Sequence, residues 1–240
     1  MPDYAGAGHL PRNRSGGLPA SPHDLPRQRR GTTPQMHGRY PDYDVLEQAG
    51  HWDEATRDVV LARVHELPPI RCFSADEVPT LRAFCDTVLA QDAEPRIPVL
   101  EMVDAKLHAR QFDGFRYAGM PDDAETWHVV AGGLDEAAGG SFAHATAGAR
   151  VDICGAFSRG ELTGAAWQRV DVGIAWKVVL RTAMGVFYSH PWAWNEIGFG
   201  GPAYPRGYAR LGIGMSESWE AEPAFDLDPV RDVRERGLDR

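Results

Sequence analysis

The chain has 240 residues, of which 43% are hydrophobic, enough to bury the core of one domain with appended segments. Its net charge of -9 argues against nucleic acid as the main partner, because binding to phosphates needs a basic face. The longest apolar stretch, residues 172–188, carries Lys177 and Arg181 on one helical face, so we predict no transmembrane segment and no direct membrane insertion.

Residues 1–42 form a basic tail rich in Pro, Gly, Ser and Arg, with almost no aliphatic side chains. Within residues 1–40, six Arg face only Asp3 and Asp24, a local charge of +4, which leaves -13 for the other residues because the total is -9. Such a segment cannot bury enough apolar surface to fold alone. We predict that it is disordered or wrapped on a partner, that residues 43–220 form a helical domain, and that residues 221–240 form a charged C-terminal tail.

Apolar residues spaced three and four apart predict a series of helices. The first runs from Trp52 to the pair Pro68-Pro69, which ends it. The second opens at Ser74, where Ser-Ala-Asp-Glu forms a capping box with Glu77. Further helices are predicted at 99–111, 121–138, 147–159 and 171–188. Because no β alternation of any length occurs, the predicted fold class is all-α: an irregular helical bundle with a long aromatic loop and an extended N-terminal tail.

The long loop is predicted at residues 187–212, where seven of the chain's 23 aromatic residues accompany three prolines and several glycines. This composition excludes regular helix or strand throughout the segment. Two interpretations remain open: the rings cap the core of the chain itself, or they anchor a protein partner, since Trp, Tyr and Arg are enriched at interface hot spots. The candidate interface residues are Tyr188, His190, Trp192, Trp194, Asn195, Tyr204, Arg206, Tyr208 and Arg210.

Sequence motifs for catalysis and cofactor binding are missing. Neither lysine follows a glycine, so no P-loop is present, and Ala203 stands where a dinucleotide-binding motif needs its third glycine. The signatures of serine hydrolases and of zinc proteases are also missing. We therefore predict no catalytic residue and no cofactor held by this chain.

One group of polar residues suggests a metal site. Glu101, Asp104 and His108 fall on one face of the predicted helix 99–111, and two carboxylates with an imidazole can bind a divalent metal. The alternative is a solvated polar face beside Lys106 and Arg110. The second alternative is favoured, because no further Glu-x-x-His pattern supplies ligands from another helix.

Two segments resemble a known family. The run from Phe187 to Tyr208 contains Tyr-Ser-His-Pro-Trp, Trp-Asn-Glu-Ile-Gly, Gly-Gly-Pro and Tyr-Pro-Arg-Gly-Tyr, and it looks like the C-terminal hallmark of the gluconate 2-dehydrogenase subunit 3 family. The upstream segment FSADEVPTLRAFCDTVLAQD, residues 73–92, is similar to the early helix of that family. The resemblance covers roughly residues 73–212.

This resemblance implies an accessory role. Members of the family are small subunits of sugar or sugar-acid dehydrogenases, in which a large subunit of the glucose-methanol-choline type holds FAD and oxidises a hydroxyl carbon. The small subunit supports folding, stability or flavin loading of the large one, and a cytochrome c subunit often takes the electrons. The resemblance therefore implies a partner with bound FAD, and a cytochrome c or another electron acceptor as a further candidate partner.

The N-terminus departs from the pattern of exported family members, which carry a twin-arginine signal. Arg29-Arg30 is followed by Gly-Thr-Thr-Pro-Gln rather than by an apolar core, and the three cysteines form no C-x-x-C motif. A cytoplasmic complex is therefore expected. Two other functions stay open: a freestanding metal-dependent enzyme using Glu101, Asp104 and His108, and an unrelated scaffold whose basic tail binds an acidic partner.

Overall fold

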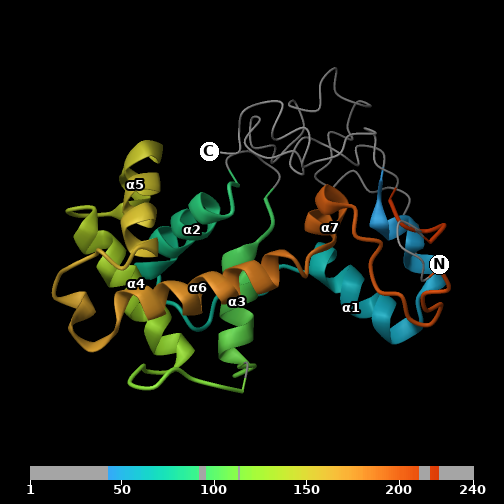
Figure 1. Cartoon of the computed structure of the whole chain (residues 1–240), viewed down its shortest axis with the longest axis horizontal. Helices are drawn as coiled ribbons and strands as arrows, with labels where there is room; N and C mark the ends of the chain where they lie inside the picture. The colour runs from blue at the N-terminus through green and yellow to red at the C-terminus, as the bar shows by residue number, and fades with distance from the viewer. Residues whose placement is uncertain (1–42, 92–95, 113, 211–216, 222–240) are drawn as a thin grey trace. The chain divides into compact units, whose positions relative to one another are not determined.

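A computed structural model describes residues 43–91, 96–112, 114–210 and 217–221 (Figure 1). All regular structure in these ranges is helical, which confirms the all-α prediction. The 3-10 helices are η3 (Val45–His51), η4 (Phe142–His144) and η5 (Ala166–Arg169), and the α-helices are α1 (Glu54–His65), α2 (Glu77–Val88), α3 (Val99–His108), α4 (Asp123–Ala137), α5 (Ala147–Ser158), α6 (Val172–Phe187) and α7 (Pro191–Ile197). The predicted N-terminal tail, and residues 222–240 of the predicted C-terminal tail, lie outside the described residues.

The described residues fall into two compact units. Unit 1 takes its residues from 1–66, 93–97 and 188–240, and unit 2 from 67–92 and 98–187. The segment predicted as one helical domain, residues 43–220, thus contributes residues to both units, and its outer boundaries stay a prediction. No helix in the described ranges combines the length and the apolar character that a bilayer crossing needs.

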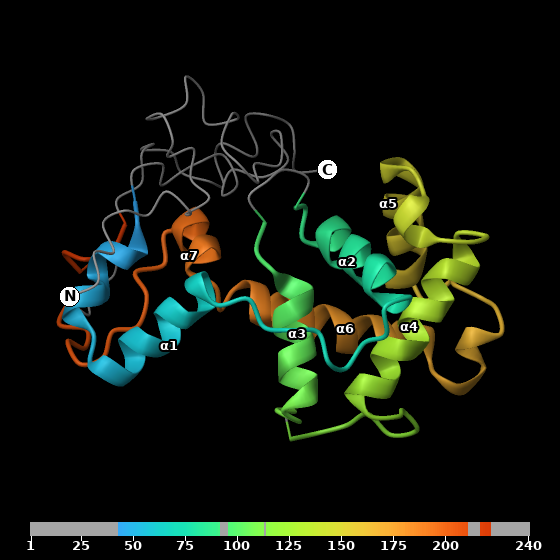
Figure 2. The same ribbon diagram turned by 180° about the vertical axis from the view of Figure 1, so that it is seen from behind.

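Unit 2 is a bundle of α2 to α6, in which α6 packs on α3, α4 and α5, and α2 packs on α3, α4 and α5 (Figure 2). Its centre is aromatic. Phe84 of α2 is fully buried, with ring centroids 6.2 Å from Trp127, 6.1 Å from Phe157 and 6.1 Å from Trp176. Edge-on and tilted ring pairs of this kind contribute about 0.5–1.5 kcal/mol each beyond the area that they bury.

Side-chain caps begin most of the helices, and one of them is the capping box predicted from the sequence. Ser74 and Glu77 form the predicted capping box: the Ser74 backbone N–H donates to Glu77 Oε2 at 2.8 Å, and the Glu77 N–H donates to Ser74 Oγ at 3.4 Å. Aspartate or threonine side chains accept from the first turn of four other helices: Asp53 in α1, Asp122 in α4, Thr146 in α5 and Asp171 in α6.

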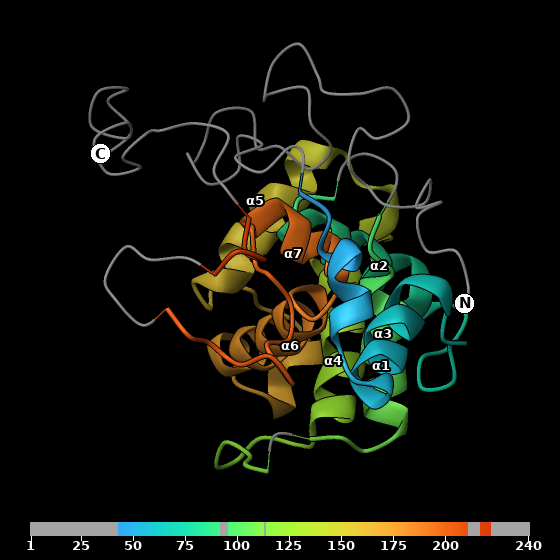
Figure 3. The same cartoon turned by 90° about the vertical axis from the view of Figure 1, so that its right-hand side faces the viewer.

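Unit 1 consists of η3, α1, α7 and the segments that follow α7, with α7 packed on η3 and α1 (Figure 3). Two of its elements were not predicted. η3 precedes the predicted first helix, which begins at Glu54 rather than Trp52, and α7 lies inside the segment predicted as a loop. The loop prediction was therefore wrong for residues 191–197, where Pro191 takes the first helical position and Gly198 ends the helix at φ 72°.

The capping box of α2 leads to a pH prediction. Burial raises the pKa of Glu77, but hydrogen bonds from the Ser74 backbone and from His128 outweigh it and hold the pKa below its usual value. A carboxyl whose pKa is lowered on folding stabilises the fold above its unfolded pKa, and this stability is lost as the pH falls through the folded pKa.

We therefore expect the free energy of unfolding to fall more steeply between about pH 5 and pH 3 in the wild type than in Glu77→Gln. The measurement is urea unfolding at a series of pH values. Ser74→Ala removes one donor and should give an intermediate slope. Equal slopes for the wild type and Glu77→Gln would contradict the assignment.

Candidate functional site

The helix α7 forms the centre of the predicted interface segment, and its first residues are buried in unit 1. His190 caps the helix, with Nδ1 accepting from the Trp192 backbone N–H at 3.1 Å. The two rings meet edge-on with centroids 4.9 Å apart, and both side chains are buried. The spacing His-Pro-Trp therefore supplies a cap, a first-turn proline and a core ring, in that order.

The second turn of α7 ties this helix to α1 and η3. The Trp194 indole N–H donates to the Tyr188 carbonyl, and the Arg63 guanidinium of α1 lies 6.0 Å from the Trp194 ring centroid. Asn195 Oδ1 accepts from the Val45 backbone N–H at 2.8 Å, and its amide nitrogen lies 3.4 Å from Asp44 Oδ1. Trp192, Trp194 and Asn195 are all buried inside unit 1. These three side chains therefore support the core-capping interpretation.

The glycines after α7 allow rings to approach the backbone. A Cβ at Gly201, where φ is +76°, would lie 2.9 Å from the Trp52 ring and 2.9 Å from Val45. A Cβ at Gly200 would lie 2.6 Å from the ring of Trp219. The Gly-Gly-Pro motif is thus explained by close packing of two tryptophans on consecutive residues.

Other predicted interface residues reach the surface of the chain. Arg206 is half-buried: its Nη1 donates to Gln48 at 2.9 Å and its guanidinium lies 4.2 Å from the Trp219 ring centroid. The side chains that remain exposed are Tyr188, Tyr204, Tyr208 and Arg210. The two interpretations of the aromatic segment therefore apply to different residues, and the role of the exposed ones at an interface stays a prediction.

Two further apolar side chains of the same segment are exposed: Phe199, one of the rings for which both interpretations were open, and Ile197, which sequence reasoning missed. Ile197 and Phe199 flank the glycine that ends α7, and each is 41% exposed. Phe199 also packs edge-on against Trp194, with ring centroids 5.4 Å apart. An apolar residue at a helix end can be buried or exposed. The sequence pattern alone therefore does not distinguish the exposed Ile197 and Phe199 from the buried Trp192 and Trp194.

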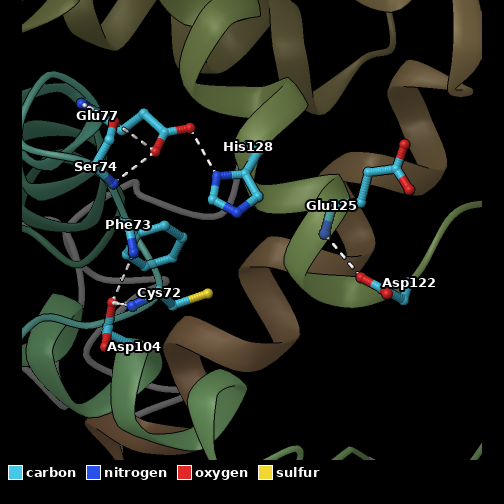
Figure 4. Close-up of polar contacts among 8 residues, drawn as sticks. All are labelled: Cys72, Phe73, Ser74, Glu77, Asp104, Asp122, Glu125 and His128. Atoms are coloured by element: carbon cyan, nitrogen blue, oxygen red, sulfur yellow. Dashed lines mark hydrogen bonds and ion pairs between the residues drawn. The ribbon is translucent and has the colours of Figure 1, made fainter.

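The candidate metal ligands do not come together. Asp104 is fully buried, and its carboxylate accepts the backbone N–H groups of Cys72 at 2.8 Å and Phe73 at 3.0 Å (Figure 4). A third backbone N–H, that of Arg71, donates to the same carboxylate at 2.8 Å. These bonds fix the segment that leads into α2. A carboxylate used in this way has little capacity left for a metal ion.

The other two candidates are engaged elsewhere or exposed. Glu101 forms an ion pair with Arg82, with Oε1 and Nη1 2.6 Å apart, and His108 lies on the exposed end of α3. Within the ranges that the structure describes, no three His, Cys, Asp or Glu side chains gather as a metal site would require. The hypothesis of a metal-dependent enzyme therefore finds no support in these residues.

A second polar cluster joins α2 to α4. Glu77 Oε1 lies 2.7 Å from His128 Nδ1, while the Ser74 hydroxyl donates to Glu77 Oε2 at 2.8 Å (Figure 4). A serine acts as a nucleophile when a histidine takes its proton, but here the hydroxyl faces the carboxylate instead. Burial, followed by the charges of nearby carboxylates, raises the pKa of Cys72, so its thiol stays protonated. The cluster therefore caps and cross-links helices rather than activating a nucleophile.

The role of Asp104 can be measured. We expect Asp104→Asn to lower the free energy of unfolding by about 2–3 kcal/mol, because the amide offers one acceptor oxygen where the carboxylate offered two. Asp152→Asn, on the exposed face of α5, is the matched control and should change it by less than about 0.5 kcal/mol. Urea unfolding followed by circular dichroism gives both values, and equal effects would refute the assignment.

The packing on Gly201 predicts a second difference in stability. Gly201→Ala should lower the free energy of unfolding by about 2–3 kcal/mol, since it combines a left-handed backbone with a clash. Gly207 also has a positive φ, of +72°, but no atom lies within 4 Å of an added Cβ. Gly207→Ala should therefore cost only about 1 kcal/mol. If the two variants unfold at the same urea concentration, the ring contacts of Gly201 contribute nothing.

Comparison with known proteins agrees with the resemblance seen in the sequence. The family model described as Gluconate 2-dehydrogenase subunit 3 matches residues 75–201, just over half of the chain. The match runs from the start of α2 through α7 to Gly201, so it includes the capping box glutamate and both glycines of the ring contacts. No curated protein and no solved structure matches the chain. The chain belongs to the gluconate 2-dehydrogenase subunit 3 family, a family of accessory subunits of a dehydrogenase.

Proposed function

We propose that this chain is a non-catalytic small subunit that stabilises a large FAD-dependent oxidoreductase of the glucose-methanol-choline type and assists its folding or flavin loading. The large subunit oxidises a sugar or sugar acid and holds the FAD. The observation that carries the proposal is the group of exposed side chains after α6: Tyr188, Ile197, Phe199, Tyr204, Tyr208 and Arg210. We call this group the exposed aromatic set.

The composition of this set favours a protein partner. Large apolar side chains that gather within one short segment are typical of interaction surfaces, whereas single exposed ones are ordinary. Tyr and Arg are also enriched at interface hot spots, and Tyr buries a large area with only two rotatable side-chain bonds to order. The set lies at and just beyond the end of the segment matched by the family, which links it to the shared role of that family.

The polar residues of unit 2 support a role without catalysis. Asp104, Glu101 and Glu77 are each paired with partners inside the unit, and the Ser74 hydroxyl donates to a carboxylate. An active site needs groups left poised for a substrate, so these residues favour a scaffold role for unit 2. In the proposal, both the FAD and the reacting groups belong to the large subunit.

The partner is found first by purification of the tagged chain from its native host. We expect a large flavoprotein to co-purify and to colour the eluate yellow. That flavoprotein is then expressed alone and together with this chain, and we expect co-expression to raise its soluble yield, its FAD content per polypeptide and its activity. The proposal fails if the large subunit alone is as soluble, as saturated with FAD and as active as the co-expressed pair.

Two variants test whether the exposed aromatic set makes the contact. Phe199→Asp places a charge in the set and should reduce co-purification of the large subunit by at least about tenfold, because a central apolar contact is commonly worth more than 1.4 kcal/mol. Val151→Asp changes another exposed apolar residue, 60% exposed on α5 in unit 2, and should have no effect. Loss of binding in both variants would move the interface away from the set.

A further inference from the structure

A ring-binding site lies on the loop of residues 200–210, and Trp219 of the same chain fills it. The indole ring rests over Gly200, with its centroid 4.2 Å from the Arg206 guanidinium and 5.3 Å from the Tyr208 ring centroid. The Tyr43 hydroxyl donates to the Trp219 carbonyl at 3.1 Å. Burial raises the pKa of Tyr43 to about 12, so this hydroxyl remains a donor at neutral pH. The indole thus meets both a cation and a bare glycine, which together suit a flat aromatic ring.

The same loop binds a carboxylate beside the ring. Glu217 Oε1 accepts from the consecutive backbone N–H groups of Ala209 and Arg210. The hydrogen bond from the Arg210 backbone lowers the pKa of Glu217, with a further contribution from Ala209. Ser218, between the two bound residues, is exposed. The loop therefore recognises an acidic residue and a tryptophan separated by one spacer.

The fit of this occupant is incomplete at Arg206. Its Nη1 bonds to Gln48, but Nε and Nη2 are buried with no hydrogen-bond acceptor among the described residues. Donors of a charged group that are buried without an acceptor cost more than those of a neutral group. A competing segment with an acceptor for these two nitrogens would be held more tightly than residues 217–219.

We propose that the loop of residues 200–210 is a receptor for a segment that consists of an acidic residue, one spacer residue and a tryptophan. In the free subunit, Glu217–Trp219 occupies this receptor. In the complex, a segment of the same chemistry from the large subunit replaces Glu217–Trp219. The last step rests on the proposed function. We call residues 217–219 the internal ligand.

Charge supports an acidic segment of the partner as the replacement. Arg206 and Arg210 belong to the receptor loop. Tyr43, which contacts Trp219, is preceded in the sequence by a segment, residues 1–40, that carries six Arg and a local charge of +4. A basic tail joined to a site that already binds a glutamate favours an acidic binding partner. An uncharged aromatic segment would leave both the tail and the backbone N–H groups of residues 209 and 210 without a complement.

The experiment uses a fluorescent peptide of residues 214–222, GMSESWEAE, added in trans to the full chain. Trp219→Ala empties the ring site, and Ser218→Ala is the matched control because that side chain is exposed. We expect the peptide to bind the Trp219→Ala chain at least about tenfold more tightly than the wild type or the Ser218→Ala chain, since an occupied site binds only in proportion to its open fraction. Adding Arg206→Gln to Trp219→Ala should abolish this gain, as should replacing the peptide tryptophan by alanine.

Anisotropy measures the binding, and circular dichroism checks that each variant is folded. Equal affinity for the wild type and the Trp219→Ala chain would overturn the receptor. The purified large subunit is then titrated into the complex of peptide and Trp219→Ala chain, and we expect it to displace the peptide.

The possible failures are distinguishable. If the large subunit co-purifies with the chain yet leaves the peptide bound, the replacement step is wrong while the proposed function stands. If no large subunit binds the chain at all, the proposed function and the replacement step fall together, and the peptide titration still decides whether the loop binds the internal ligand.

Discussion

Consecutive glycines at 200 and 201 set the constraint on which unit 1 depends. One holds the Trp219 ring and the other holds the Trp52 ring, each nearer to the backbone than a Cβ would permit. Trp52 directly follows η3, and Val45 at the start of η3 also meets Gly201. Three segments therefore meet at these two glycines: η3 with Trp52, the segment after α7, and the residues around Trp219. A side chain at either glycine would push one of these rings away from the backbone, so the packing requires glycine at both positions.

In unit 2 the carboxylates of Asp104 and Glu77 both hold segments of the bundle in place, but they do so through different hydrogen bonds. The Asp104 carboxylate replaces a turn of regular hydrogen bonds by collecting three backbone N–H groups from the segment before α2. Glu77 closes the capping box on one side and reaches His128 of α4 on the other. Buried or half-buried carboxylates that are satisfied in this way stabilise an arrangement of helices. Asp104 and Glu77 therefore serve the packing of unit 2.

The sequence predicted the helices of unit 2 well because their apolar residues recur at helical spacing, so that α5 begins at Ala147 as expected and α3 begins at Val99. It predicted unit 1 less well. The segment 187–212 was expected to be a loop because proline and glycine interrupt it, but a proline in the first turn and a glycine after the last are both compatible with a short helix. The metal hypothesis for Asp104 overlooked that an acid on a helix can bind the backbone of a distant segment, which has no periodic signature.

Trp219 shows the limit of local patterns most clearly. Its position after an acidic residue and a serine carries no helical or strand period, and its partners lie at Tyr43, Gly200 and Arg206, far apart in the chain. The site accepts Trp219 because the Arg206 guanidinium lies over the indole ring, and because Gly200 has no side chain that would exclude the ring. In the proposed function the subunit displays Tyr and Phe rings to a partner, and exposing such rings is a cost while the subunit is alone. Trp219 packs on Tyr208 of this segment, and in the proposed replacement a segment with acceptors for Arg206 Nε and Nη2 takes the place of this tryptophan.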